Sequence, residues 1–241
     1  MFAGSVVVVT GASSGVGRAV AIELAAAGAS VALVGRDRTT LPVNECSAVG
    51  HGVFRPYVAD LEREGEIVEL ASAIERDFGA TNVLVHGAGV IVSGNVERAS
   101  FADFDRQYWC NVRGPWILTQ QLLPGLIKQA GQVVFLNSSL GLSARAGVSQ
   151  YAATKHALRA VADSLREEVN ATGIRVLSVY LGQTATPMQA RLYREAGRRY
   201  RPERLIQPKD VALVIASALA LPRTIEVTDI TVRPQAAPLA E

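Results

Sequence analysis

The sequence contains few of the residues that build disulfide frameworks or metal centres. Its 241 residues include only two cysteines, Cys46 and Cys110, and three histidines. Two isolated cysteines fit neither a disulfide framework nor a zinc cluster with its regular ligand spacing. We therefore expect a protein without a metal ion, in a reducing compartment such as the cytoplasm.

Charge imbalance and long apolar runs are also absent. Lys and Arg number 24 and Asp and Glu number 22, a net charge of +2, which is too balanced for a dedicated nucleic-acid binder. The longest predominantly apolar run, residues 211–221, has about half the length needed to span a bilayer. A strand-like run at residues 5–10 begins almost at once, so we expect no secretory signal. The expected partner is a small molecule, with no nucleic acid and no membrane.

Short β-branched runs alternate with longer Ala-rich segments along the chain, the pattern of βαβ units. We predict an α/β fold with one domain, residues 1–241. Its core is a Rossmann-like, doubly wound parallel sheet of about seven strands with helices on both faces. The predicted strands are 6–10, 30–34, 53–58, 82–86, 132–137, 174–179 and 229–232. The predicted helices are 15–27, 62–78, 101–111, 115–129, 148–171 and 209–221.

One segment, residues 188–207, departs from the even charge distribution, with six arginines against two glutamates. We predict that it forms a substrate lid over the carboxyl edge of the sheet. Glu195 lies four residues from an arginine on either side, the spacing of exposed ion pairs on a helix. The alternative is that a surplus arginine, such as Arg194 or Arg198, attracts an anionic substrate or the cofactor phosphate. Residues 233–241 are predicted to be a frayed tail.

A glycine-rich turn, Thr-Gly-Ala-Ser-Ser-Gly-Val-Gly at residues 10–17, follows the first predicted strand and opens the first helix. Its glycines allow backbone N–H groups to close on a pyrophosphate at a helix N-terminus. The spacing is not the Gly-x-Gly-x-x-Gly pattern, and a tight turn without a ligand is the alternative interpretation. We predict a dinucleotide site whose contacts include Gly11, Ser13, Ser14, Gly15, Val16 and Gly17.

The end of the second strand indicates which dinucleotide is bound. About twenty residues after the turn, an acidic residue would bond the ribose 2′-OH of NAD, but Gly35 stands there and Arg36 follows. A guanidinium can hold a 2′-phosphate through paired, charge-assisted hydrogen bonds. NADP(H) is therefore favoured over NAD(H). Alternatively, Arg36 faces solvent and Asp37 or Arg38 contacts the cofactor.

With Asn111, Ser138, Tyr151 and Lys155 added, the chain resembles the short-chain dehydrogenases/reductases (SDRs), in the branch with chains near this length. The resemblance covers most of residues 5–232 and includes Asp60-Leu61, Gly87-Ala88-Gly89, Tyr151-Ala-Ala-Thr-Lys155 and Leu181-Gly182-x-x-x-Thr186. It implies an oxidoreductase that transfers hydride between NADP(H) and a carbonyl or secondary alcohol. It also implies a homodimer or homotetramer, formed through the helices within 101–129 and 148–171.

The resemblance also implies further cofactor contacts. Asp60 would bond the adenine amine and Leu61 would flank the ring, although Asp60 could instead be an ordinary helix cap. Thr186 would meet the nicotinamide carboxamide, with an ordinary loop hydroxyl as the alternative. The remaining contacts implied are Ala88, Gly89, Tyr151, Lys155 and Thr184.

Tyr151 and Lys155 are four residues apart on a predicted helix, so their side chains share one face. A phenol with a pKa of about 10 exchanges protons poorly at neutral pH, and lowering that pKa by about three units requires roughly 4 kcal/mol of preferential phenolate stabilisation. The Lys155 ammonium supplies charge of the required sign, so we predict a lowered Tyr151 pKa. The positive nicotinamide of the oxidised cofactor would add to the effect.

Ser138 follows the fifth predicted strand, at the edge where ligands of such sheets bind. Its hydroxyl can stabilise the developing alkoxide while Tyr151 protonates it. Ser139 is the alternative, but the Ser-x-x-Gly pattern of the family matches Ser138 with Gly141. By the same resemblance, Asn111 would hold a water that links Lys155 to solvent.

Two positions depart from the family pattern. His86 stands where the family commonly has Asn, and Leu181 stands where it has Pro; we expect a packed strand-end histidine and an altered pocket shape. The alternative functions are a redox sensor, an epimerase or dehydratase, and an enoyl reductase. A redox sensor that binds NADP(H) would not need the Tyr-Lys pair, an epimerase or dehydratase would need a longer chain, and an enoyl reductase spaces Tyr and Lys differently. The predicted substrate pocket is Leu140, Gln150, Gln183, Met188 and Leu192.

Overall fold

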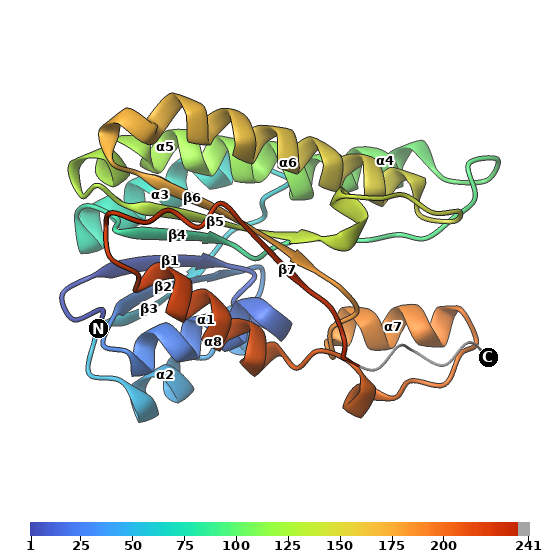
Figure 1. Cartoon of the computed structure of the whole chain (residues 1–241), viewed down its shortest axis with the longest axis horizontal. Helices are drawn as coiled ribbons and strands as arrows, with labels where there is room; N and C mark the ends of the chain where they lie inside the picture. Colours follow the sequence, from blue (N-terminus) through green and yellow to red (C-terminus); the bar gives the residue numbers. More distant parts are fainter. Residues whose placement is uncertain (236–241) are drawn as a thin grey trace.

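Seven parallel strands form one sheet in the order β3-β2-β1-β4-β5-β6-β7 (Figure 1). The central strands are runs of β-branched residues buried on both faces, as a covered parallel sheet requires. The computed structural model confirms the predicted Rossmann-like class. The strands are β1 (Val6–Thr10), β2 (Ser30–Gly35), β3 (Phe54–Val58), β4 (Val83–His86), β5 (Gln132–Ser138), β6 (Arg175–Leu181) and β7 (Asp229–Val232).

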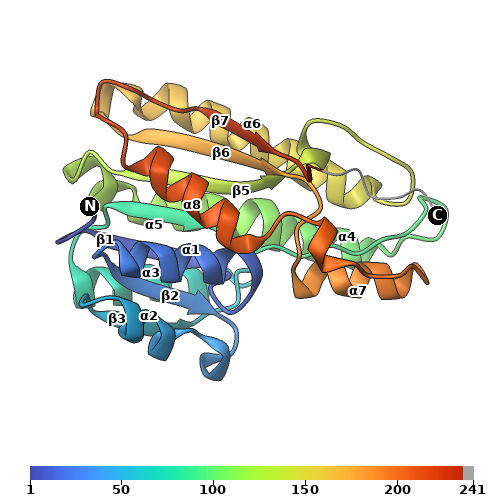
Figure 2. The ribbon, with the colours of Figure 1, turned by 60° about the horizontal axis from the view of Figure 1, so that its bottom comes forward.

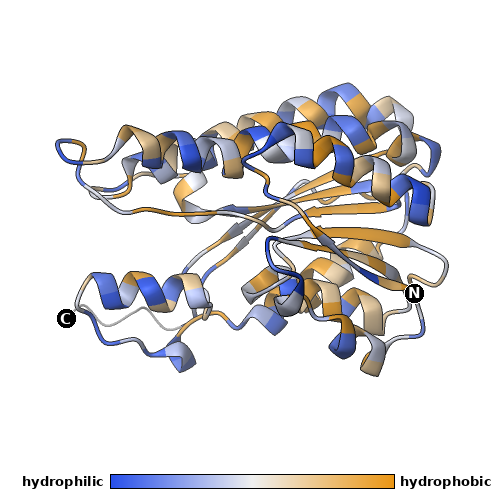
Figure 3. Ribbon diagram, turned by 180° about the vertical axis from the view of Figure 1, so that it is seen from behind, coloured by the Kyte–Doolittle hydropathy of each residue, from blue (hydrophilic) through white to orange (hydrophobic). Residues whose placement is uncertain are grey.

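Helices cover both faces of the sheet (Figures 1 and 2). One layer contains α1 (Gly15–Ala26), α2 (Val43–Val49) and α8 (Pro208–Leu219). The other contains α3 (Glu64–Phe78), α5 (Gly114–Lys128) and α6 (Ser149–Val169). Successive strand residues point to opposite faces, so Val7 and Val9 pack in the first layer and Val8 in the second. Colouring by hydropathy shows the apolar sheet between these layers (Figure 3).

The structure describes residues 1–235. Within this range, no helix combines the length and apolar character that a membrane span needs. The predicted tail, 233–241, falls largely outside the described residues.

The connection between α4 (Phe101–Tyr108) and α5 differs from the prediction of two separate helices. Instead, a π-helix, Trp109–Arg113, joins them into one helical run. Gly114 allows this run to approach the segment that follows β3, because a Cβ at that position would lie 2.5 Å from the Leu61 carbonyl oxygen. Pro115 is the second residue of α5 and follows the π-helix directly.

Two helices were not predicted. The seven-residue α2 is too short for a clear apolar period, and α7 (Pro187–Glu195) lies within the predicted lid. In Figures 1 and 3, α7 stands apart from both helical layers, beyond the carboxyl ends of the strands. The lid therefore contains a defined helix.

The sheet reverses its direction of winding between β1 and β4, which are hydrogen-bonded neighbours although two strands separate them in sequence. Connections after these strands diverge to opposite faces, and such switch points are where open α/β sheets bind ligands. The fold therefore places the carboxyl ends of β1, β4, β5 and β6 around the candidate site.

Two leucines of α8 test the packing of the first layer. Leu219 is 4% exposed and packs in the core, whereas Leu213 is 45% exposed. We expect Leu219→Ala to lower the free energy of unfolding by about 3 kcal/mol and Leu213→Ala by less than about 1 kcal/mol. Urea denaturation of both variants measures the difference. Equal losses would contradict the arrangement of α8.

Candidate active site

A cavity of about 370 Å³ opens at the carboxyl edge of the sheet. It is enclosed by the turn after β1, the ends of β2, β4, β5 and β6, and the α7 lid. All the residues predicted to bind the cofactor line it: Gly11, Ser13, Ser14, Gly15, Val16, Gly17, Arg36, Asp60, Leu61, Ala88, Gly89, Tyr151, Lys155, Thr184 and Thr186.

The glycine-rich turn is packed against the segment that follows β4. Thr10 Oγ1 accepts hydrogen bonds from the N–H groups of Gly87 (3.1 Å) and Ala88 (3.2 Å). Gly11 has φ +69°, and a Cβ there would lie 2.7 Å from the Ala88 nitrogen; a Cβ on Gly17 would lie 2.4 Å from the Gly11 carbonyl oxygen. These contacts require glycine and leave the first N–H groups of α1 facing the cavity. The turn therefore fits a pyrophosphate.

The end of β2 presents Arg36 to the cavity. Asp37 is engaged elsewhere, since its Oδ1 accepts hydrogen bonds from the Thr39 N–H (2.9 Å) and hydroxyl (2.7 Å). These bonds hold the pKa of the Asp37 carboxyl below its usual value. A Cβ on Gly35 would lie 3.0 Å from Leu41 Cδ2, so a carboxylate there would need rearrangement. The charged group that the end of β2 presents to the cavity is therefore the Arg36 guanidinium.

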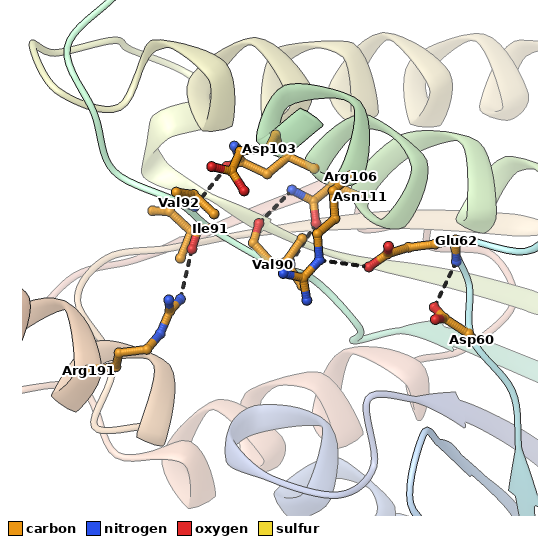
Figure 4. Close-up of polar contacts among 10 residues, drawn as sticks. Asp60, Glu62, Val90, Ile91, Val92, Asp103, Arg106, Asn111 and Arg191 are labelled. Carbon is orange, nitrogen blue, oxygen red and sulfur yellow. Dashed lines mark hydrogen bonds and ion pairs between the residues drawn. The ribbon is translucent and has the colours of Figure 1, made fainter. Parts of the chain in front are cut away.

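Asp60 lines the cavity and also organises the turn before α3. Its Oδ1 accepts the Glu62 N–H at 3.0 Å, and its own N–H donates to Glu66 Oε2 at 2.8 Å. Glu62 in turn pairs with Arg106 of α4 at 3.1 Å (Figure 4). These bonds lie in the turn before α3, which begins at Glu64 with Arg63 as its N-cap and no capping side chain. Asp60 is therefore not the ordinary helix cap that was the alternative, and the turn holds its carboxylate beside the cavity.

Ser138, Tyr151 and Lys155 meet where β5 passes into α6. Ser138 is the last residue of β5, and its Oγ accepts the Leu140 N–H at 3.1 Å. Tyr151 and Lys155 lie on successive turns of α6, with Nζ of Lys155 5.8 Å from the centre of the Tyr151 ring. Nζ also donates to the Leu136 carbonyl at 3.0 Å. All three side chains face the cavity.

Asn137 and Gly141 fix this junction. Asn137 Nδ2 donates to the Lys155 carbonyl at 3.1 Å. A Cβ on Gly141 would lie 2.6 Å from Asn137 Oδ1 and 2.9 Å from the same carbonyl. The Ser-x-x-Gly pattern thus has a packing reason, because the glycine lets the 3₁₀ turn Ser139–Gly141 close on α6. Ser138 and Ser139 both line the cavity, and it is the Ser138 side chain that hydrogen-bonds with Tyr151.

Burial dominates the ionisation of the Tyr-Lys pair. It raises the pKa of Tyr151 to about 12, although a hydrogen bond with the Ser138 side chain opposes the increase. It also lowers the pKa of Lys155 to about 8. The prediction that Lys155 lowers the Tyr151 pKa is therefore wrong for the cofactor-free protein. Exclusion of water from the phenol is the physical reason.

Asn111 lies in the π-helix and does not line the cavity. Its Oδ1 accepts the Val90 N–H and its Nδ2 donates to the Val90 carbonyl, both at 2.8 Å (Figure 4). Nδ2 also donates to Thr154 Oγ1 at 3.0 Å. A Cβ on Gly89 would lie 3.3 Å from Asn111 Oδ1 and 3.9 Å from Lys155 Nζ. Asn111 thus positions the segment after β4 beside Lys155, and the water relay stays a prediction.

Four of the residues predicted for the substrate pocket, Leu140, Gln183, Met188 and Leu192, line the cavity. The prediction for Gln150 is corrected, because its amide donates to the Ser100 carbonyl (2.9 Å) and accepts from Gln107 Nε2 (3.1 Å). It therefore ties α6 to α4. The direction in which the Gln150 side chain points from α6 depends on how α4 packs against α6. The sequence alone does not show this packing. Arg145 and Ile91 also line the cavity, and the sequence analysis missed both.

The α7 lid is attached across the cavity. Arg191 donates to the Ile91 carbonyl at 2.7 Å (Figure 4) and pairs with Glu195 at 3.3 Å. One of the two predicted lid ion pairs is thereby present. Thr186 caps α7, its Oγ1 accepting the Gln189 N–H at 3.2 Å.

The two departures from the family pattern are accommodated. His86 is buried, its ring stacks on Phe135 with centroids 4.9 Å apart, and its Nε2 lies 2.7 Å from Thr119 Oγ1. Burial lowers the pKa of His86 to about 3, so the ring is neutral at physiological pH. Leu181 extends β6 and pairs with Ser138 and Val232.

Comparison with known proteins finds relatives that match most of the chain. A profile of the short chain dehydrogenase family matches residues 5–197. An uncharacterised oxidoreductase of Staphylococcus epidermidis is 31% identical over 95% of this chain and 96% of its own length. One of Staphylococcus aureus is 29% identical over 95% of this chain and 96% of its own.

Two solved structures have similar folds. An alcohol dehydrogenase of the archaeon Thermococcus sibiricus, complexed with 5-hydroxy-NADP, superposes with a TM-score of 0.88 at 23% identity, over 98% of this chain and 99% of that one. A metagenomic short-chain oxidoreductase in complex with NADP gives a TM-score of 0.84 at 28% identity, with the same coverage. The chain belongs to the short chain dehydrogenase family of oxidoreductases.

Proposed function

We propose that this protein transfers hydride between NADP(H) and a carbonyl or secondary alcohol, with Tyr151 as general acid and base. The observation that carries the proposal is the meeting of the Tyr151 phenol, the Ser138 hydroxyl and the Lys155 ammonium in the cavity that holds the glycine-rich turn. When bound, the nicotinamide cofactor supplies or accepts the hydride.

The chain's own residues handle the proton. In reduction, Tyr151 donates its phenolic proton to the carbonyl oxygen of the substrate, while the Ser138 hydroxyl stabilises the negative charge that develops there. Lys155 stabilises the phenolate that remains on Tyr151. In oxidation the same groups act in reverse, and Tyr151 accepts the proton of the alcohol.

The preference for NADP(H) rests on Arg36. It is the charged side chain that the end of β2 presents to the cavity, while Asp37 is held by Thr39. The two similar solved structures contain NADP or a derivative of it, which supports the same cofactor here.

We also propose a cytoplasmic homodimer or homotetramer. The outer faces of α4 and α5 expose large apolar side chains, among them Phe101 (87% exposed) and Trp116 (49% exposed). Removing such side chains from water favours association through these helices.

Replacement of the phenol tests the proposal. Tyr151→Phe is expected to reduce kcat with NADPH and a carbonyl substrate by about a thousandfold or more, because the proton donor is lost. The affinity for NADPH is expected to remain within about fivefold. Steady-state kinetics on a panel of ketones and aldehydes measures kcat. Quenching of protein fluorescence by NADPH measures the affinity for the cofactor.

Tyr180→Phe is the matched control, since it removes a buried hydroxyl that does not line the cavity. It should leave kcat within about threefold of the wild type. Full activity of Tyr151→Phe would refute the proposed mechanism and favour a protein that binds the cofactor without Tyr-dependent turnover.

Cofactor choice is tested at Arg36. Arg36→Gln is expected to raise KM for NADPH by about 10- to 100-fold, since a charge-assisted pair with the 2′-phosphate is removed. KM for NADH should change by less than about threefold. Arg38→Gln, an exposed position outside the cavity lining, is the control and should leave both values unchanged. An equal increase for the two cofactors would show that Arg36 does not bind the 2′-phosphate.

A further inference from the structure

The cavity carries its charges unevenly. Within the described residues, the carboxylates that line it are Asp60 and Glu62, which follow β3. Tyr151 and Ser138 belong to the junction after β5, and β3 and β5 are four strand spacings apart in the sheet order. Both carboxylates are already engaged, because Glu62 pairs with Arg106 of α4 and Asp60 accepts the Glu62 N–H. The charged side chains lining the substrate end are Lys155 and Arg145.

Arg145 has a charge available for a ligand. Within residues 1–235, its side chain makes no hydrogen bond or ion pair, in contrast to Arg191, which binds the Ile91 carbonyl and Glu195. Arg145, Arg194 and Arg198 are all exposed, but of these three only Arg145 lines the cavity. Arg145 is therefore the better candidate for the anion-binding role first considered for the lid arginines.

The backbone that carries Arg145 is anchored on both sides. It lies between Ser138 and Tyr151, at the ends of β5 and α6. Close to it, Gly147 has φ +79° and its carbonyl accepts the Gly94 N–H at 2.8 Å. This bond attaches the loop that carries Arg145 to the segment that follows β4. The guanidinium thus belongs to a loop with fixed ends rather than to a free tail.

Apolar side chains line the cavity near Tyr151. Leu140, Ile91, Met188 and Leu192 pack with Tyr151 in one cluster. Met188 and Leu192 are four residues apart and share one face of α7. An extended hydrocarbon chain fits such a wall, and a carboxylate at its far end would reach a cation at the rim.

We propose that Arg145 binds the carboxylate of the substrate, and that the substrate is an oxo acid, or the corresponding hydroxy acid, with an aliphatic chain between the two groups. This inference rests on the proposed function. Arg145 would orient the substrate through a bidentate, charge-assisted pair while Ser138 and Tyr151 hold the oxygen that reacts. It acts as a specificity residue and takes no part in proton transfer.

The test uses straight-chain oxo acids of increasing length and their methyl esters, with NADPH and the full-length protein. Wild type is expected to reduce at least one acid with a kcat/KM at least tenfold above that of its ester. Arg145→Gln should lower kcat/KM for that acid by about tenfold or more, mainly through KM, and leave the ester within about twofold. Arg145→Lys should restore part of the loss, because it keeps the charge without the bidentate fork.

Two controls separate the interpretations. Arg194→Gln should change neither substrate, and the affinity of Arg145→Gln for NADPH, measured by fluorescence quenching, should equal that of the wild type. Equal reduction of acids and esters throughout the series, or equal losses for both in Arg145→Gln, would overturn the Arg145 assignment alone. Reduction of neither acids, esters nor simple ketones and aldehydes would overturn the proposed function and this inference together.

Discussion

The site depends on the burial of one ammonium group. Lys155 is 4% exposed, and its Nζ is held by the Leu136 carbonyl at the end of β5. Removing a cation from water is unfavourable, which is why burial lowers the Lys155 pKa to about 8. Such a group does not contribute favourably to folding, so its presence beside Tyr151 is best explained by function.

Much of the surrounding structure serves to hold this group in place. Asn137 binds the Lys155 carbonyl, and Gly141 allows the 3₁₀ turn to close against it. Asn111 holds the segment after β4 next to Nζ. The Tyr151 pKa of about 12 in the cofactor-free protein then has a simple interpretation. The phenol keeps its proton until a positive charge, such as that of an oxidised nicotinamide, lies next to it.

The sequence predicted the sheet well because each buried strand is a compact β-branched run flanked by glycine or polar residues. It also predicted that Ser138, Tyr151 and Lys155 share one site, and all three line the same cavity, since residue type and spacing in one chain segment carry that information. It did not show the π-helix before α5, the orientation of Gln150 or the position of Arg145, because these depend on packing between distant segments. The sign of the Tyr151 pKa shift was wrong for a related reason: exclusion of water is a property of the folded cavity.

Direct titration of the Tyr151 phenol tests the central claim. The ring can be labelled with ¹³C-tyrosine, assigned with Tyr151→Phe, and followed by NMR up to pH 11 in the free protein and with saturating NADP⁺. We predict no titration of Tyr151 in the free protein within this range, and a pKa lower by about three units or more with NADP⁺ bound. Absence of Tyr151 titration up to pH 11 with NADP⁺ bound, as in the free protein, would contradict a catalytic role for the phenol.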